Sequence, residues 1–255
     1  ARVVITLLQE GYRVVLVHGN GPQVSRELIR SEEASTKLPP RSLEVCIAAT
    51  QSTVGELLVR ELRNLLRREQ LEHDVLALHT QVLVSREDPA FNTPDKAIGP
   101  TYTEWRAKEL MKTTKWNFVE DGKDQWRRVV PSPSPLDIMG IDAIARLVDS
   151  GTIVLAGGGG GVPLVVDSKG EFVGVEAVVD KDHTAALMAE VHEKTAAQPW
   201  RFFRIGTWEL GDSLALEEEV GQASQLIEAF KDVPNAVLEL KTKSDVVSQD
   251  EHENG

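Results

Sequence analysis

Residues 13–23 read RVVLVHGNGPQ, an apolar run that is followed at once by a turn of small residues. The β-branched residues of 13–18 are typical of a strand that is buried on both faces of a sheet. Gly19 and Gly21 end the strand, and residues 23–30 are expected to start a helix. A strand, a turn and a helix in this order predict one unit of a parallel α/β sheet.

The rest of the chain alternates in the same way. Helices are expected at 1–10, 43–69, 103–113, 138–149, 184–191 and 214–230, and strands at 73–84, 152–156, 173–179, 201–205 and 237–240. Residues 121–128 are expected to form a hairpin. Residues 85–102 are rich in Pro, Asp, Asn and Gly and should form a loop or lid. We therefore predict a three-layer α/β/α sandwich with a mostly parallel central sheet and a small protruding lid subdomain.

Composition excludes several classes of function. The 255 residues carry a net charge of −12, which argues against general nucleic-acid binding, because such binding needs clustered Lys and Arg. No apolar run is long enough to span a bilayer, and no signal peptide is visible. Cys46 is the only cysteine, is expected to be buried, and fits a reducing compartment such as the cytoplasm. Any anion site must be local, built from a few lysines and backbone N–H groups.

Three turns follow predicted strands, where parallel α/β sheets bind ligands. The turn Gly19-Asn20-Gly21 lacks the third glycine of a dinucleotide fingerprint and the Gly-Lys-Ser/Thr of a Walker A loop. Its spacing leaves open whether it binds an anion or is a plain tight turn. The five consecutive glycines 157–161 are more than a turn needs, which favours a close approach of Gly158, Gly159 and Gly160 to a ligand.

The third turn contains Lys181 between Asp180 and Asp182. A lysine fixed between carboxylates suits phosphoryl transfer, but the cluster taken alone is more typical of a solvated, ion-paired turn. A lone loop lysine such as Lys96 is also more often solvated. His18 is expected to be a structural imidazole, and Arg127 with Arg128 to form surface ion pairs.

Eight motifs in a fixed order change this interpretation. They are HGNGPQV at 18–24, TQ at 50–51, TQVLV at 80–84, DPAF at 88–91, KAIGP at 96–100, RVVPSP at 128–133, GGGGGVP at 157–163 and GVEAVVDKD at 174–182. Together they resemble the carbamate kinases, a branch of the amino acid kinase family, over about residues 1–190.

The resemblance implies a reversible reaction, ATP plus carbamate giving ADP plus carbamoyl phosphate, with ATP/ADP and Mg²⁺ as cofactors. By it, Gly19, Asn20 and Gly21 line the site of carbamate and of the transferred phosphate. Lys96 lies on a lid subdomain at about 85–130, Lys181 bridges the phosphates, and Asp182 holds the catalytic lysines. No residue is assigned as a metal ligand. The resemblance also implies a cytoplasmic homodimer in arginine metabolism.

The chain also departs from the family pattern. It begins after the strand and phosphate-gripping loop with which the family opens, and the adenine-binding part is not recognisable after about residue 192. We expect an amino-acid-kinase-like domain at 1–192, a divergent part at 193–240 and a disordered tail at 241–255. Ser25 stands where the family usually has Gly, and His183 where it usually has Leu.

Three functional hypotheses remain open. The first is an active carbamate kinase. The second is a catalytically impaired or non-catalytic member that lacks part of the nucleotide site. The third is another amino acid kinase, such as an acetylglutamate kinase.

Overall fold

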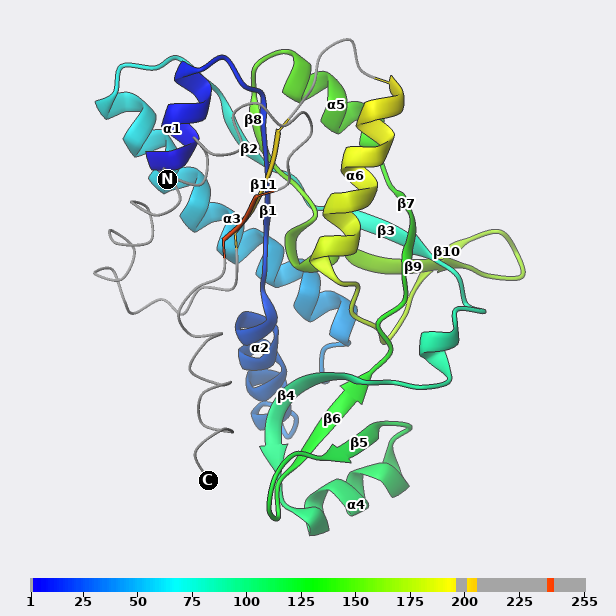
Figure 1. Ribbon diagram of the computed structural model, residues 1–255. Coiled ribbons are helices and arrows are strands. Elements are labelled where there is room, and N and C mark those ends of the chain that lie inside the picture. The colour runs from blue at the N-terminus through cyan, green and yellow to red at the C-terminus, as the bar shows by residue number, and fades with distance from the viewer. Residues whose placement is uncertain (1, 196–200, 206–237, 241–255) are drawn as a thin grey trace.

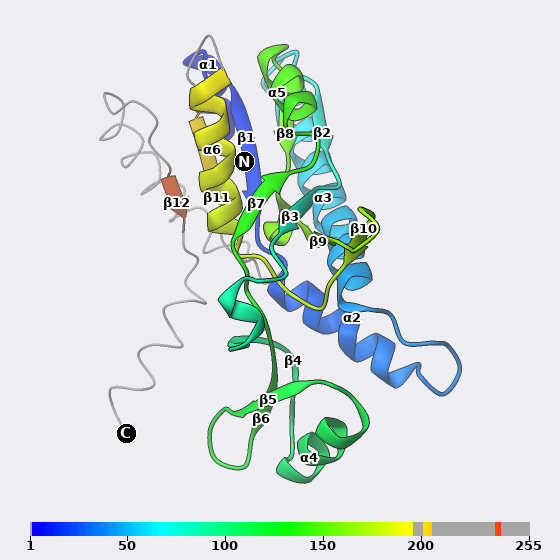
Figure 2. The same ribbon diagram turned by 90° about the vertical axis from the view of Figure 1, so that its right-hand side faces the viewer.

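The computed structural model describes residues 2–195, 201–205 and 238–240 (Figures 1 and 2). It confirms the predicted α/β fold. A five-stranded sheet has the order β12-β11-β1-β8-β2, and every neighbouring pair is parallel. Its strands are β1 (Val14–His18), β2 (Val75–Ala77), β8 (Ile153–Leu155), β11 (Arg201–Ile205) and β12 (Leu238–Leu240).

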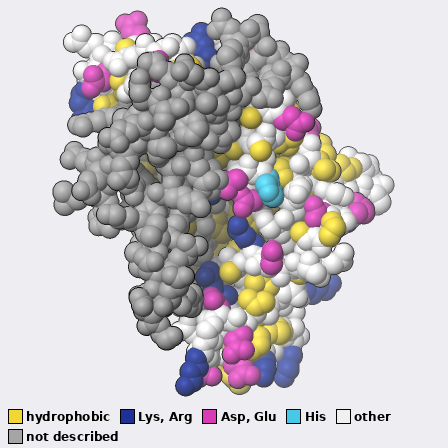
Figure 3. All heavy atoms as spheres, in the orientation of Figure 1, with side chains coloured by type: hydrophobic (Ala, Val, Ile, Leu, Met, Phe, Trp, Pro, Cys, Tyr) yellow, Lys and Arg dark blue, Asp and Glu magenta, His cyan; other side chains and the backbone are white. Residues whose placement is uncertain are grey.

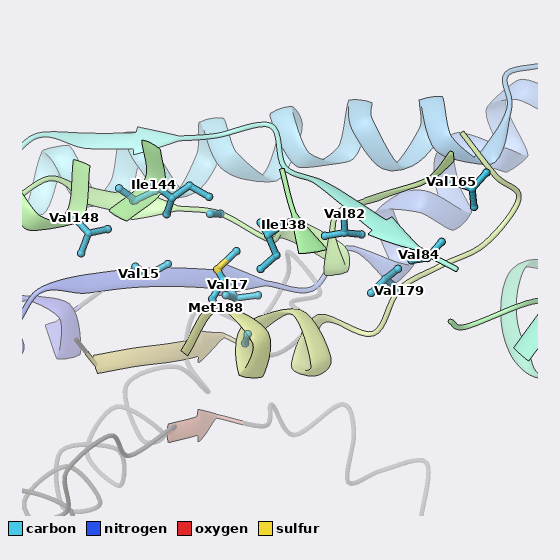
Figure 4. Close-up of a cluster of buried hydrophobic side chains, with 13 residues drawn as sticks. Val15, Val17, Val82, Val84, Ile138, Ile144, Val148, Val165, Val179 and Met188 are labelled. Atoms are coloured by element: carbon cyan, nitrogen blue, oxygen red, sulfur yellow. The ribbon is translucent and has the colours of Figure 1, made fainter. Parts of the chain in front are cut away.

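Helices cover both faces of this sheet. Successive side chains of β1 point to opposite faces, so each face presents apolar residues for a helix to cover. Val14 and Leu16 belong to a buried cluster with α1 (Arg2–Gln9) and α3 (Leu43–Arg68). Val15 and Val17 belong to a second cluster, shown in Figure 4, with α5 (Ile141–Asp149) and α6 (Lys181–Thr195). The helices and the sheet form the three layers that the sequence predicts.

A second, four-stranded sheet has the order β10-β9-β3-β7. Its strands are β3 (Gln81–Val84), β7 (Pro135–Ile138), β9 (Val162–Val166) and β10 (Phe172–Gly174). The parallel pair β2–β8 of the first sheet continues along the chain as the parallel pair β3–β9 of the second. The prediction of one strand at 73–84 is therefore wrong, because the chain bends between two strands that belong to different sheets.

Two further expectations for this region are wrong. Residues 135–138 form a strand, so the helix predicted from residue 138 begins only at Ile141. The strand predicted at 173–179 ends at Gly174, because the chain then leaves β9 and the Val178 N–H donates to the Pro131 carbonyl instead, at 3.0 Å.

Residues 157–161, which we call the glycine corner, make the bend between β8 and β9. Four of them have positive φ, between 62° and 90°, a conformation that strongly favours glycine. Protein atoms also fill the space where side chains would lie. A methyl group on Gly159 would meet the Asn20 amide at 2.1 Å, and one on Gly160 would meet the Val179 carbonyl oxygen at 2.1 Å. The fold itself therefore requires these glycines.

A protruding lobe, residues 96–130, extends from the body at the bottom of Figure 1. It contains the antiparallel sheet β4-β6-β5 and one helix, with β4 (Lys96–Tyr102), α4 (Glu104–Thr113), β5 (Asn117–Glu120) and β6 (Trp126–Val130). A short helix η1 (Pro89–Phe91) precedes the lobe. Lys96 was expected in a loop, but it begins β4, since it pairs with Val130 across the sheet. The hairpin predicted at 121–128 is confirmed as β5–β6.

Helix α2 (Gly21–Glu33) follows the first turn and runs beside the lobe. In the described part of the chain, no helix has an apolar stretch long enough to cross a membrane. The strands expected at 201–205 and 237–240 are present as β11 and β12. The helix expected at 214–230 and the tail at 241–255 lie outside the described residues.

The glycine corner gives a test of the fold. We expect Gly160→Ala to lower the free energy of unfolding by about 2–5 kcal/mol, from left-handed strain plus overpacking against the Val179 carbonyl. Gly170→Ala is the matched control, because Gly170 also has positive φ but a methyl group there meets nothing within 4 Å. It should cost only about 1–2 kcal/mol. Urea unfolding measures both, and equal losses would contradict a packing requirement at the corner.

Candidate active site

The first flank of the site is the start of α2. Asn20 occupies the N-cap position, but its side chain makes no capping hydrogen bond. The amide instead donates to Thr50 Oγ1 at 2.9 Å and packs against Gly159. The N–H groups of the first helical turn therefore have no side-chain cap from Asn20, and the start of a helix attracts anions. The turn Gly19-Asn20-Gly21 lies directly beside the glycine corner.

Buried polar side chains hold the glycine corner in place. The Gln51 amide clamps Thr80, accepting its N–H at 2.8 Å and donating to its carbonyl at 3.0 Å. Thr80 Oγ1 accepts the Gly157 N–H at 2.9 Å. On the other side, Thr184 Oγ1 donates to the Gly160 carbonyl at 2.7 Å. Gln51 and Thr80 stand in the motifs quoted above without an assigned role, whereas Thr184 was missed as a functional residue.

The second flank is the start of α6, which lies on the opposite side of the glycine corner from Asn20. A methyl group on Gly160 would lie 3.2 Å from the Asp180 carbonyl carbon. Asp180 Oδ1 accepts the Asp182 N–H at 2.8 Å, and α6 begins at Lys181. The predicted start at residue 184 is therefore three residues late, because Asp180 serves as a helix cap.

The lysines of the site are each paired with a carboxylate. Lys96 Nζ, from the lobe, lies 3.3 Å from Asp180 Oδ2, and Lys181 Nζ lies 3.5 Å from Asp182 Oδ1. The structure thus places Lys96, Lys181 and Asp182 at one segment of the chain, residues 180–182, which Lys96 reaches through Asp180. The resemblance gave Asp182 the task of holding both lysines, but Lys96 is paired with Asp180. The signal for Asp180 was its position as an acidic residue just before a helix.

The Asp180 carboxyl is held ionised by its neighbours. Its burial acts to raise the pKa, but the Asp182 N–H and the Lys96 ammonium outweigh this effect and lower the pKa to about 2. The pairing between the lobe and the body at this point is therefore a pairing of full charges at neutral pH. Figure 3 shows acidic and basic side chains mixed on the face between the body and the lobe.

Arg128 corrects the expectation of surface ion pairs. Only 5% of its side chain is exposed, it lies over the Trp116 ring at 3.8 Å, and it donates to Glu176 Oε2. Glu176 Oε1 accepts the Leu43 N–H at the start of α3, at 3.0 Å. Burial lowers the pKa of the Arg128 guanidinium. The root of the lobe is thus fixed to the segment that leads to Asp180. Arg127 pairs with Asp121 at 3.7 Å, nearer to the surface.

His18 and Cys46 have the structural surroundings that the sequence predicts. The His18 ring is buried, which lowers its pKa, and Nδ1 contacts the Gly19 carbonyl at 3.0 Å. Its ring also packs against Gly158. Cys46 is fully buried in the cluster under the lobe, and burial raises the pKa of its thiol.

The donors around the glycine corner suit an anion. They are the start of α2, which has no side-chain cap from Asn20, and two lysines, in a chain whose net charge is −12. Among the described residues, no group of three or more His, Cys, Asp or Glu side chains is arranged to hold a metal ion.

Comparison with known proteins decides the family. The family model described as the amino acid kinase family matches residues 1–194. The chain belongs to the amino acid kinase family. The match ends close to residue 192, where the sequence pattern changes.

Carbamate kinases are among the similar members of this family. The chain is 43% identical over 192 residues to the carbamate kinase of Pyrococcus horikoshii, covering 74% of this chain and 61% of that protein. It is 42% identical over 191 residues to that of Staphylococcus haemolyticus, with 74% and 62% covered. The solved carbamate kinase from Giardia lamblia bound to AMP-PNP matches with a TM-score of 0.72 and 33% identity, covering 79% of this chain and 62% of that one. The chain spans about three fifths of the length of these relatives.

The pairing at Asp180 predicts a pH dependence. Asp180→Asn keeps a capping side chain but removes the charge, so it should destabilise the fold at neutral pH. Because the folded-state pKa is lowered, the contribution is present above the ordinary value of 3.8 and is lost as the pH falls through about 2. The difference in unfolding free energy between wild type and variant should shrink across this window. Urea titrations at several pH values measure it, and a constant difference would contradict the pairing.

The buried guanidinium gives a second prediction. Glu176→Gln leaves Arg128 without its anionic partner and should lower the free energy of unfolding by about 1–3 kcal/mol. Glu104→Gln is the matched control, because Glu104 pairs with Lys108 on the surface of α4, where both side chains are more than half exposed. It should cost less than about 0.5 kcal/mol. Thermal and urea unfolding measure the loss of stability in both variants. A loss in Glu176→Gln no larger than that in Glu104→Gln would refute a stabilising role for the Arg128–Glu176 pair.

Proposed function

We propose that this chain forms the carbamate-binding side of a phosphotransferase that interconverts ATP plus carbamate with ADP plus carbamoyl phosphate. The observation that carries the proposal is the presence of the start of α2, without a side-chain cap from Asn20, and of two lysines around one glycine corner. The transferred phosphoryl group carries charge on three oxygens and needs preorganised positive groups more than covalent help. The similarity to carbamate kinases supports carbamate as the acceptor.

The two lysines have different parts in this proposal. The Lys181 side chain is only 20% exposed and starts α6, so it is the fixed charge that bridges the phosphates. The Lys96 side chain is 45% exposed and enters from the lobe, so its charge arrives with the lobe. Asp180 orients the Lys96 ammonium by accepting a hydrogen bond from it at 3.3 Å, and Asp182 attracts the Lys181 ammonium as an ion pair at 3.5 Å. Neither aspartate binds phosphate itself, because like charges repel.

The backbone supplies the remaining donors. Gly19, Asn20 and Gly21 offer the uncapped start of α2 to the acceptor and the transferred phosphate. The hydrogen bonds that fix the glycine corner use the N–H groups of Gly157, Gly160 and Gly161. Within the described part of the chain, this leaves the N–H groups of Gly158 and Gly159 for a bound anion. This is the substrate-binding role we propose for Gly158 and Gly159, whereas Gly160, whose N–H donates to the Gly157 carbonyl, keeps the shape of the corner.

Family membership also supports proposals for the cofactors, the compartment, the oligomeric state and the metabolic role. We assign ATP/ADP as the nucleotide, supported by the relative solved with AMP-PNP. Mg²⁺ is commonly held by the phosphates together with one or two carboxylates, and it would neutralise phosphate charge there. Asp180 and Asp182 are the nearest carboxylates to such a group. A cytoplasmic homodimer that acts in arginine metabolism belongs to the same proposal.

A binding-only role is the second candidate. It is favoured by the end of the family match at residue 194, after which the sequence carries no recognised part of the family pattern. Thermal unfolding with ADP and Mg²⁺ separates the candidates. A rise in Tm supports a nucleotide site, and no shift at millimolar ADP would count against the enzyme. A substrate panel with carbamate and acetylglutamate tests the acceptor, and transfer to acetylglutamate alone would overturn our choice.

The role of Lys181 is tested by Lys181→Ala. We expect the turnover number to fall by about 10²–10³, the usual cost of one preorganised charge donor, with the fold intact by circular dichroism. Lys169→Ala is the matched control, since Lys169 lies in the turn between β9 and β10 and should leave turnover unchanged. A coupled assay of ATP formation from carbamoyl phosphate measures both. An unchanged rate in Lys181→Ala would remove this lysine from the mechanism.

A further inference from the structure

One face of helix α2 follows strand β4 of the lobe. Ser25, Leu28 and Glu32 are three and four residues apart, so they lie on the same side of the helix. Leu28 lies 3.9 Å from the position of a methyl group on Gly99. Glu32 accepts from the Tyr102 hydroxyl at 2.9 Å and from the Arg106 guanidinium at 3.4 Å. Helix α2, which begins at the turn Gly19-Asn20-Gly21, therefore also contacts the lobe along one of its faces.

Ser25 makes the contact nearest to the site. Its Oγ accepts the Gly99 N–H at 3.2 Å. Gly99 lies where β4 leaves the register of the lobe sheet, because Ile98 pairs with Arg128 but Thr101 pairs with Arg127. Gly99 has φ +72°, and its carbonyl accepts from Arg127 at 3.4 Å. A residue in such a bulge is left out of the ladder, so its N–H needs another acceptor.

Lys96 lies three residues before this bulge on the same strand. Its ammonium reaches Asp180 at 3.3 Å while its backbone pairs with Val130. A shift of the bulge along α2 would move the strand that carries Lys96 and would change this distance. The ion pair between Arg106 of the lobe and Glu32 of α2 contributes little to holding the lobe on the helix, because both side chains are partly exposed, at 42% and 30%.

We propose that Ser25 is a positioning residue, whose hydroxyl fixes the β4 bulge on α2 and thereby holds Lys96 at Asp180. The catalytic consequence rests on the function proposed above, whereas the positioning itself does not. The family pattern usually has Gly at this position, which offers no hydroxyl. The contact would then be a feature of this chain rather than of the family.

The first test is amide hydrogen exchange on the full chain, which needs no activity. Ser25→Ala should speed exchange at the Gly99 amide by about 2- to 10-fold, the effect of one net hydrogen bond. Ser31→Ala is the matched control on the same helix, because Ser31 Oγ accepts the Arg41 N–H at 2.7 Å. It should change exchange at Arg41 and leave Gly99 alone. Unchanged exchange at Gly99 in Ser25→Ala would overturn the proposal.

The second test reads the position of Lys96. A limiting acylating reagent, followed by mass spectrometry, should modify Lys96 about 2- to 10-fold faster in Ser25→Ala, because a lysine released from its carboxylate reacts more readily. Lys169 serves as the internal reference. Ser25→Thr keeps the hydroxyl and should restore the wild-type rate. Faster exchange at Gly99 with no change at Lys96 would reduce Ser25 to a local contact and refute the positioning role.

Kinetics separate this inference from the proposed function. If the chain turns over carbamoyl phosphate, Ser25→Ala should lower kcat by about 2- to 10-fold, with the KM for ADP unchanged. If exchange and acylation respond but the wild-type chain shows no turnover, the positioning role stands and the proposed function fails. If turnover is present and kcat is unaffected while Lys96 moves, the positioning role stands and its catalytic consequence is refuted.

Discussion

The backbone of residues 157–161 turns a corner inside the protein, where a methyl group at residues 158–161 would lie within 2.1–2.8 Å of other protein atoms. The turn joins the two sheets, because β8 ends before it and β9 begins after it. It also separates the starts of two helices, with Asn20 packed on one side and Asp180 on the other. The spacing of every donor in the candidate site therefore depends on this corner keeping its shape. Gln51, Thr80 and Thr184 hold it from neighbouring elements.

Local sequence patterns predicted the helices and strands whose formation depends on interactions between residues close in sequence. The β-branched run before Gly19 gave a buried strand, and the apolar spacing at 43–69 gave a long helix, because such periods hold over whole elements. The order of the eight motifs then indicated the residues of the candidate site. Lys96 was misassigned to a loop because its strand exists only through pairing with a segment about 30 residues away. The bend inside 73–84 was also missed, since both halves are apolar and look like one strand.

Side-chain partners were the least predictable part of the site. Asp180, Lys181 and Asp182 are adjacent in sequence, and nothing in that order shows which carboxylate faces the lobe. Arg128 looked like a surface residue because it follows another arginine, but it begins the buried half of β6, where Trp116 and Glu176 enclose it, while Arg127 stays partly exposed. Those two partners come from other segments of the chain, which a charge count does not contain.

Helix α2 is a stiff rod of 13 residues, about 20 Å long at 1.5 Å per residue. One end begins at the turn Gly19-Asn20-Gly21, and the other end lies beside Tyr102 of the lobe. A rod fixed at both ends transmits tilt with little bending. The direction of the helix at its first turn and the place of the lobe are therefore set by one backbone element about 20 Å long.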